Sequence, residues 1–304
     1  MGLVHKALQG SYVKRTYWLG ALVALVLSMA TLNPVSTGAS VASIQASSPC
    51  GLPGATSYQH VVWILLENQG YSVIGSSSAS YLNSLASACG LATNDYAVSH
   101  PSLPNYVALT SGSTQGITDD GEPSVHPLSV PSIFSELGSN WSSLAESMPS
   151  RCDRVTSGEY AARHNPAVYY RSITSSCQRN DVPLKLPFNL SKEFTFITPN
   201  VCNDMHSCSV ATGDEWLRRY VPKIIASPQY QARSLVLFIT FDENDLQSSN
   251  QVPTVVIAPS VPRGHRVGQR FTHYSLLRTT ETLLHLPLLG NARSASSMLQ
   301  PFHL

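Results

Sequence analysis

The chain has 304 residues, of which 43% are hydrophobic and 12% are charged. Its 19 basic and 18 acidic side chains nearly balance, which argues against a broad electrostatic surface for nucleic acid or for an anionic membrane. The length is sufficient for one large α/β domain with a substantial core.

The N-terminal residues 1–42 have the pattern of a secretory signal peptide. Basic residues precede an apolar run from Trp18 to Leu32, and small residues lead to a cleavage site predicted near Ala42. This run is shorter than the roughly 20 residues of a typical membrane span, so we expect no stable membrane insertion after cleavage, with an uncleaved anchor as the alternative. Removing the signal takes away three of the 19 basic residues and none of the 18 acidic ones. We therefore expect a mildly acidic mature protein, secreted from the cell or held in its envelope.

Residues 43–57 are small and polar and predict a flexible lead-in, whereas residues 58–304 contain no repeat or linker and predict a single domain. All six cysteines lie beyond the signal, and an even number in an exported chain predicts three disulfides. Zinc binding is the alternative use, although the spacings fit no standard zinc finger. Six cysteines allow about 15 connectivities. Sequence proximity favours the pairs Cys50–Cys89, Cys152–Cys177 and Cys202–Cys208.

Two continuous apolar runs, residues 60–66 and 235–240, predict central strands that are covered on both faces. Pro253, in a further predicted strand, indicates a sheet edge or a strand start. Strands that alternate with helices predict an α/β fold, a three-layer α/β/α sandwich with a mostly parallel central sheet. The other predicted strands are 92–98, 194–197 and 252–258, and the predicted helices are 81–88, 105–110, 132–137, 141–147, 214–230 and 273–285.

The segment Ser99–Tyr106 brings a hydroxyl, an imidazole and a carboxamide together, and two prolines stiffen it. Its helical continuation places Ser102 just before a helix N-terminus, where free backbone N–H groups and the helix dipole attract an anion such as phosphate. The structural alternative is a proline-rich connector whose serine caps the helix.

Polar side chains follow the two central strands directly. Glu67 and Asn68 come after the first strand, and Asp242 and Glu243 follow the second. Because ligands bind beyond the carboxyl ends of parallel strands, these four side chains are candidates for one site. A cluster of up to three carboxylates is unfavourable unless a cation neutralises it, so the pattern predicts a bound divalent metal ion. A turn with a helix cap is the alternative.

Two loops supply candidate histidines. His164 lies in a proline-terminated turn after Arg163, and a lone histidine of this kind is more often structural or exposed. Asp204 and His206 lie between Cys202 and Cys208, and a disulfide there would hold both side chains in a rigid loop. A disulfide-pinned surface loop without chemistry is the alternative.

In this order the motifs resemble the bacterial phosphoesterase family of acid phosphatases and phospholipases C, within the alkaline-phosphatase-like superfamily. The motifs are Glu67–Asn68, His100–Tyr106, Arg163–Pro166, Thr198–His206, Asp242–Glu243 and His273–Thr279. The resemblance implies Ser102 as the nucleophile, and it implies His164 and His206 in catalysis. It also implies a single divalent metal ion, because the Asp-His pair of two-zinc relatives reads Asp242-Glu243 here. The implied metal ligands are Glu67, Asn68, Asp242 and Glu243, and the implied substrate-binding residues are His100, Asn105 and Asp204.

The function that this resemblance implies is a secreted, metal-dependent acid phosphatase that hydrolyses small phosphate monoesters through a phosphoserine. Phospholipase C is the alternative, disfavoured because no lipid-binding module or exposed apolar helix is evident. The rival of another class is a secreted binding protein without turnover, against which the intact Ser102, Glu67 and Asp242 argue. A serine hydrolase with an acyl substrate is a third option, which is disfavoured because this chain has no Gly-x-Ser-x-Gly turn. The oligomeric state is not predicted.

Overall fold

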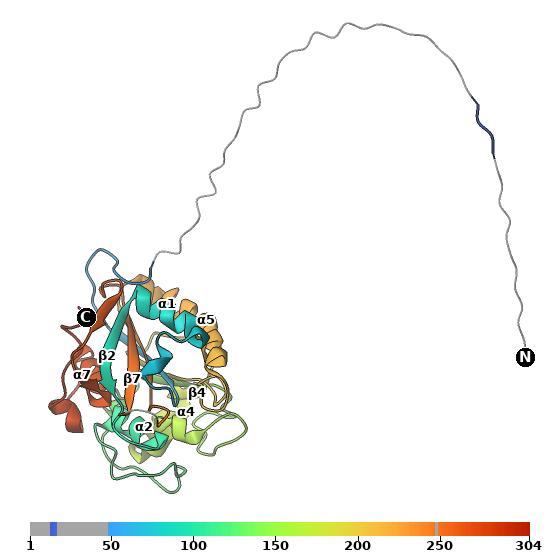
Figure 1. The fold of residues 1–304 in the computed structure, drawn as a ribbon. Coiled ribbons are helices and arrows are strands. Elements are labelled where there is room, and N and C mark those ends of the chain that lie inside the picture. Colours follow the sequence, from blue (N-terminus) through green and yellow to red (C-terminus); the bar gives the residue numbers. More distant parts are fainter. Residues whose placement is uncertain (1–12, 17–47, 247–248) are drawn as a thin grey trace, which may run out of the picture. The chain divides into compact units, whose positions relative to one another are not determined.

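The computed structural model describes residues 13–16, 48–246 and 249–304, and its centre is one β-sheet (Figure 1). In the described residues the sheet has nine strands, in the order β4-β3-β5-β1-β6-β7-β2-β8, with β9 paired to β2. Strand β7 is antiparallel to both of its neighbours, and the other described pairs are parallel. The strands are β1 His60–Leu66, β2 Gly90–Tyr96, β3 Trp141–Ala145, β4 Asp181–Pro183, β5 Phe194–Thr198, β6 Leu235–Phe241, β7 Gln251–Ile257, β8 His265–Val267 and β9 Phe271–Thr272.

Helices cover both faces of this sheet. In Figure 1, α7 lies on one side of β2 and β7, and α1 and α5 lie on the other. Helix α1 packs against α5, and α2 packs against α7. The predicted α/β sandwich with a mostly parallel central sheet is therefore confirmed. The described α-helices are α1 Ser80–Ala88, α2 Ser102–Ser111, α3 Ile133–Glu136, α4 Thr174–Asn180, α5 Val210–Ile225, α6 Pro228–Gln231 and α7 His273–Leu283.

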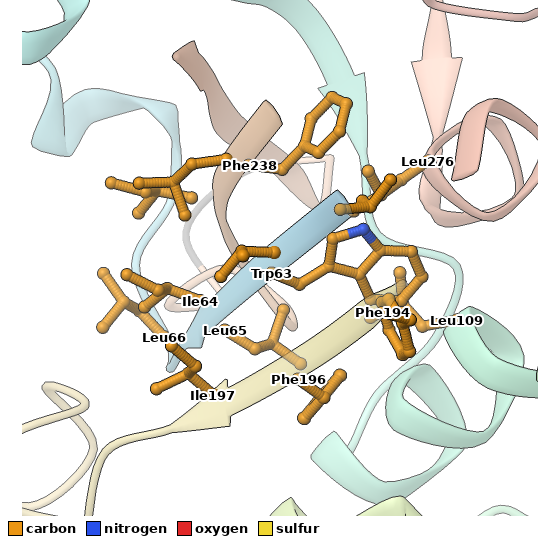
Figure 2. Packing of buried hydrophobic residues seen from close by; sticks show 14 of the residues in the cluster. Trp63, Ile64, Leu65, Leu66, Leu109, Phe194, Phe196, Ile197, Phe238 and Leu276 are labelled. Carbon is orange, nitrogen blue, oxygen red and sulfur yellow. The ribbon is translucent and has the colours of Figure 1, made fainter. Parts of the chain in front are cut away.

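The core is built on β1, whose side chains from Val61 to Leu66 are all buried. Because alternate residues of a strand point to opposite faces, a strand covered on both sides needs apolar residues at every position. Figure 2 shows Trp63 beside Phe194 and Leu276 on one face, and the Trp63 Nε1–H donates to Thr280 Oγ1 of α7 at 3.0 Å. The two continuous apolar runs thus form adjacent central strands, β1 and β6.

Two predictions about the sheet are wrong. Residues 141–147 were predicted as helix but contain strand β3, where Trp141 is buried and the chain pairs with β4 and β5. A five-residue strand is too short for its period to be recognised against a helix. Pro253 lies in β7, which is an internal strand. It is tolerated because the β2 ladder is irregular opposite it and the β6 register ends at Val255.

The helix predicted over residues 214–230 begins earlier, at Val210, where the Ser209 side chain accepts the Thr212 N–H. It ends at Ile225, and a separate short helix, α6, follows from Pro228. The guanidinium of Arg278 in α7 donates to the carbonyl oxygens of Ala292 and Arg293, so this side chain fastens the C-terminal segment to the helix.

The three disulfides favoured by sequence proximity are all present: Cys50–Cys89, Cys152–Cys177 and Cys202–Cys208. The first fastens the lead-in to the end of α1, and the third closes the loop that carries Asp204. The alternative of zinc binding by these cysteines is therefore excluded.

The predicted cleavage site near Ala42 lies outside the described residues. Among the helices that the structure describes, none has the length and apolar character needed to cross a membrane.

Candidate active site

The site lies at the carboxyl edge of the sheet. Strands β1, β2, β5 and β6 all run in the same direction, so the segments that follow them emerge at one edge. Glu67 follows β1 and Asp242 follows β6, and the two turns are tied together because the Asp242 N–H donates to the Leu66 carbonyl at 3.0 Å. The Glu67 N–H donates to the Asp204 carbonyl at 2.8 Å, which fixes the disulfide loop to the same edge.

Ser102 is the first residue of α2, and its side chain lies among carboxylates. The residue is only 2% exposed. Its hydroxyl donates to Glu67 Oε2 at 3.0 Å, and Glu243 Oε1 lies 3.5 Å away. The proximity of the same hydroxyl opposes the rise in the pKa of the Asp242 carboxyl. Three of the four predicted metal ligands therefore surround the serine.

The charge at this site suits a hard divalent cation. Burial, followed by repulsion from Glu243, raises the pKa of Asp242 to about 7. Burial, followed by repulsion from Asp120, raises the pKa of Glu243 to about 7, and burial and Asp242 raise the pKa of Glu67. Within the described residues, Asp242 Oδ2 is buried without a hydrogen bond. Converging carboxylate oxygens and an unsatisfied buried acceptor fit the oxygen ligands of Mg²⁺, Mn²⁺ or Ca²⁺.

Glu67 also belongs to a second buried group, with His164 and Asp204, whose ligand atoms all lie within 4.8 Å of one another. His164 Nδ1 lies 3.1 Å from Asp204 Oδ2, and its Nε2 lies 3.3 Å from Glu67 Oε1. Burial lowers the pKa of His164 well below its usual value and raises that of Asp204 to about 8. Both shifts favour the neutral forms of this pair. Glu67 thus faces the serine with one oxygen and the histidine with the other.

The remaining predicted residues hold the site in different ways. Asn68 contributes its backbone N–H, which donates to Asp242 Oδ1 at 3.1 Å. His100 Nδ1 lies 2.5 Å from Glu243 Oε2 at the rim. Asn105 lies inside its own turn: its Oδ1 accepts from two backbone N–H groups, and its Nδ2 donates to the carbonyls of Ser99 and Pro101.

Three residues at the site were given no role from the sequence. The Tyr106 hydroxyl donates to Glu67 Oε1, and its ring stacks on His164 with centroids 5.3 Å apart. Tyr106 lies one helical turn after Ser102, so the i, i+4 spacing could have indicated it. Arg163 Nη2 lies 3.2 Å from Nε2 of the exposed His206. Asp120 accepts the Leu103 N–H at 2.9 Å, and no sequence signal marks this contact from a long loop.

Comparison with known proteins identifies a matching family model and several relatives. The model of the phosphoesterase family matches residues 67–287. A phosphatidylinositol-3-phosphatase of Mycobacterium tuberculosis is 34% identical over 245 residues, which are 78% of this chain and 81% of that protein. An acid phosphatase of Aspergillus fumigatus is 29% identical over 286 residues, which are 85% of this chain and 62% of the fungal protein. The chain thus spans less than two thirds of that fungal relative.

Solved structures agree on the fold. An alkaline phosphatase superfamily protein from Vibrio parahaemolyticus superimposes with a TM-score of 0.54 at 11% identity, covering 79% of this chain and 71% of that one. A lipoteichoic acid synthase from Listeria monocytogenes gives 0.53 at 12% identity, covering 80% of this chain and 77% of that one. At such identities the likeness shows the alkaline-phosphatase-like fold alone. The match of the family model over most of the chain shows more: this chain belongs to the phosphoesterase family, the hydrolases of phosphoric ester bonds.

Proposed function

We propose that this protein is an exported, metal-dependent acid phosphatase that hydrolyses small phosphate monoesters with Ser102 as its nucleophile. One observation carries the proposal: the Ser102 hydroxyl is buried at the start of α2 and lies within hydrogen-bonding distance of carboxylates from two separate strand ends. A serine that only capped the helix would have no reason to meet Glu67 and Glu243.

Glu67, Asp242 and Glu243 would hold the metal ion, with Asn68 fixing Asp242 through its backbone N–H. A divalent cation bound there supplies positive charge that favours the serine alkoxide and screens the charge of the phosphate. The protein's own groups prepare the nucleophile. Glu67 Oε2 accepts the hydrogen bond of the Ser102 hydroxyl and would take its proton on attack, and α2 fixes the position of Oγ, so the hydroxyl is aligned before substrate binds.

The histidines have different positions and therefore different proposed roles. His164 is buried between Glu67 and Asp204, where it holds both carboxylates in place. His206 is exposed at the rim, with its ring 5.7 Å from that of His164. We assign to His206 the proton that the departing alcohol needs, because His206 is the one of the two that a substrate outside the carboxylate cluster can reach. After the ester bond breaks, water attacks the phosphoserine and releases phosphate.

Asn105 and His100 receive supporting roles in this proposal. All four hydrogen bonds of the Asn105 carboxamide go to the backbone around Ser102, so it holds the nucleophile turn and has no group free for substrate. His100 fixes Glu243. For Asp204, the resemblance implies substrate binding, but we propose that its carboxylate instead holds His164 in place.

The named relatives support monoester hydrolysis over phospholipase C, since both are phosphatases by name. Three disulfides support export, because such bonds persist in oxidising compartments. The test compares turnover of p-nitrophenyl phosphate with that of p-nitrophenylphosphorylcholine by the purified protein. We expect the monoester to be hydrolysed much faster. Faster hydrolysis of the choline diester would support the phospholipase C alternative, and hydrolysis of neither ester would support a binding protein.

A further inference from the structure

Asp120 lies in the long loop between α2 and α3, and its carboxylate reaches into the proposed active site. Its Oδ1 accepts the backbone N–H of Leu103 at 2.9 Å. Leu103 is the second residue of α2 and directly follows Ser102. The other carboxylate oxygen of Asp120, Oδ2, lies 3.7 Å from Nε of Arg163. An anion from a distant loop therefore lies beside the nucleophile.

The groups that face Asp120 are those that bind phosphoryl oxygens. A backbone N–H in the first turn of a ten-residue helix is one, and an arginine is another. Arg163 Nε is buried and makes no hydrogen bond within the described residues, since 3.7 Å is too long for one. It therefore retains a donor for an oxygen that comes closer than Asp120 does.

The helix end is not the only feature of this position. Asp242 is completely buried near Ser102, and its Oδ2 has no hydrogen bond in the described structure. A phosphoryl group attacked by Ser102 must place its other oxygens near the serine, and the Leu103 N–H and Arg163 are the donors beside it. The Asp120 carboxylate is 37% exposed, so leaving this position returns it to water at little cost.

We propose that Asp120 is an internal competitor of the phosphoryl group. In the substrate-free protein its carboxylate occupies the anion position formed by the Leu103 N–H and Arg163, and substrate or product phosphate displaces it. Its return after turnover promotes the release of phosphate. This inference rests on the proposed phosphatase function and adds to it a residue that sets the affinity for phosphate.

The competing explanation is that Asp120 only positions Arg163, and the two predict opposite effects. A competitor weakens phosphate binding, so removing its charge must tighten binding. A positioning residue strengthens phosphate binding, so removing it must weaken binding. If Asp120 occupies the position in about nine of ten molecules, its loss lowers the apparent Kd by about tenfold.

The experiment is a calorimetric titration of the full-length protein with inorganic phosphate, in buffer that contains Mg²⁺. Asp120→Asn keeps an oxygen that can accept from Leu103 but removes the charge. Asp119→Asn is the matched control, because this adjacent carboxylate is 63% exposed and pairs with His126 away from Ser102. Thermal unfolding of each variant confirms that it is folded.

We expect the Kd for phosphate to fall about tenfold in Asp120→Asn and to stay unchanged in Asp119→Asn. Arg163→Gln should raise the Kd. An unchanged or raised Kd in Asp120→Asn overturns the inference. If wild-type protein neither binds phosphate nor hydrolyses p-nitrophenyl phosphate, the proposed function fails with it. Normal wild-type hydrolysis without tighter binding by Asp120→Asn rejects only the inference.

Discussion

The Tyr106 hydroxyl donates to Glu67 Oε1, while Oε2 of the same carboxylate accepts the Ser102 hydroxyl. Tyr106 and Ser102 are one turn apart on α2, so a single helix holds Glu67 by both oxygens. Glu67 is fully buried, and a carboxylate in such a place keeps its orientation only while its acceptors are satisfied. The geometry of the nucleophile therefore depends on a tyrosine outside the proposed metal ligands.

Replacing Tyr106 by phenylalanine tests this dependence. We expect kcat for p-nitrophenyl phosphate to fall about tenfold, because loss of a hydrogen bond that orients a metal ligand commonly costs 10- to 100-fold. Tyr230→Phe is the control, since it also loses a buried hydrogen bond, to the Pro49 carbonyl at 2.7 Å, but far from Ser102. Equal losses of activity in both variants would show a general effect on stability instead.

Removing a carboxylate from the proposed metal site should remove the response to metal. We expect Mg²⁺ or Mn²⁺ to raise the unfolding temperature of the wild type. At a free metal concentration of a hundred times Kd, the free energy of unfolding should increase by about 2.7 kcal/mol. Asp242→Asn should lose this rise and, without metal, should be at least as stable as the wild type because repulsion is relieved. Asp95→Asn changes a buried aspartate that accepts from Thr254 outside the site, and should keep the response. The same metal-dependent rise in Asp242→Asn would contradict the assigned ligands.

The role given to His206 predicts a dependence on the leaving group. His206→Asn should lower kcat/KM for an alkyl phosphate by about 10² to 10⁴, because an alkoxide needs a proton to depart. The loss for p-nitrophenyl phosphate should be much smaller, since p-nitrophenolate leaves without one. His285→Asn removes an exposed histidine elsewhere and should change neither rate. Equal losses for both substrates would assign His206 to binding.

Asp181 makes the stability of the fold pH-dependent away from the site. Burial raises its pKa from 3.8 to about 7, against the hydrogen bond from Asn165 and the nearby hydroxyl of Ser143. The folded state therefore binds the proton more tightly, and the contribution is fully present below pH 3.8 and is lost as the pH rises through 7. Three pKa units correspond to at most about 4 kcal/mol.

The measurement is the free energy of unfolding between pH 4 and 8 for the wild type and Asp181→Asn. The variant should gain stability relative to the wild type as the pH rises. Glu215→Gln, which alters a side chain that is 72% exposed, should run parallel to the wild type. A constant difference between wild type and Asp181→Asn would exclude a raised pKa.

Much of the fold could be predicted because a short, continuous apolar run in an α/β protein is stable mainly as a central strand that is covered on both faces. Residues 61–66 and 235–239 are apolar at every position and form adjacent buried strands. The failures have local causes. Residues 141–145 form a strand because β4 and β5 flank them, which is a tertiary contact that no local pattern contains.

The site was predictable where residues follow strands directly, as Glu67 and Asp242 do. It was not predictable where long loops return, since the path of the loop that brings Asp120 to Leu103 depends on packing. The carboxamide of Asn105 shows a further limit. Its residue type suits substrate and backbone equally, and only the geometry shows that the backbone uses all of its hydrogen bonds.

The most direct test of the account is to trap the protein during turnover. Protein that is hydrolysing p-nitrophenyl phosphate is quenched in acid, digested and mapped by mass spectrometry, because phosphoserine survives acid and phosphohistidine does not. We predict phosphate on the peptide that contains Ser102, absent from Ser102→Ala, which should itself be nearly inactive. Full turnover by Ser102→Ala, or phosphate found on a different residue, would contradict the assignment of Ser102 as the nucleophile.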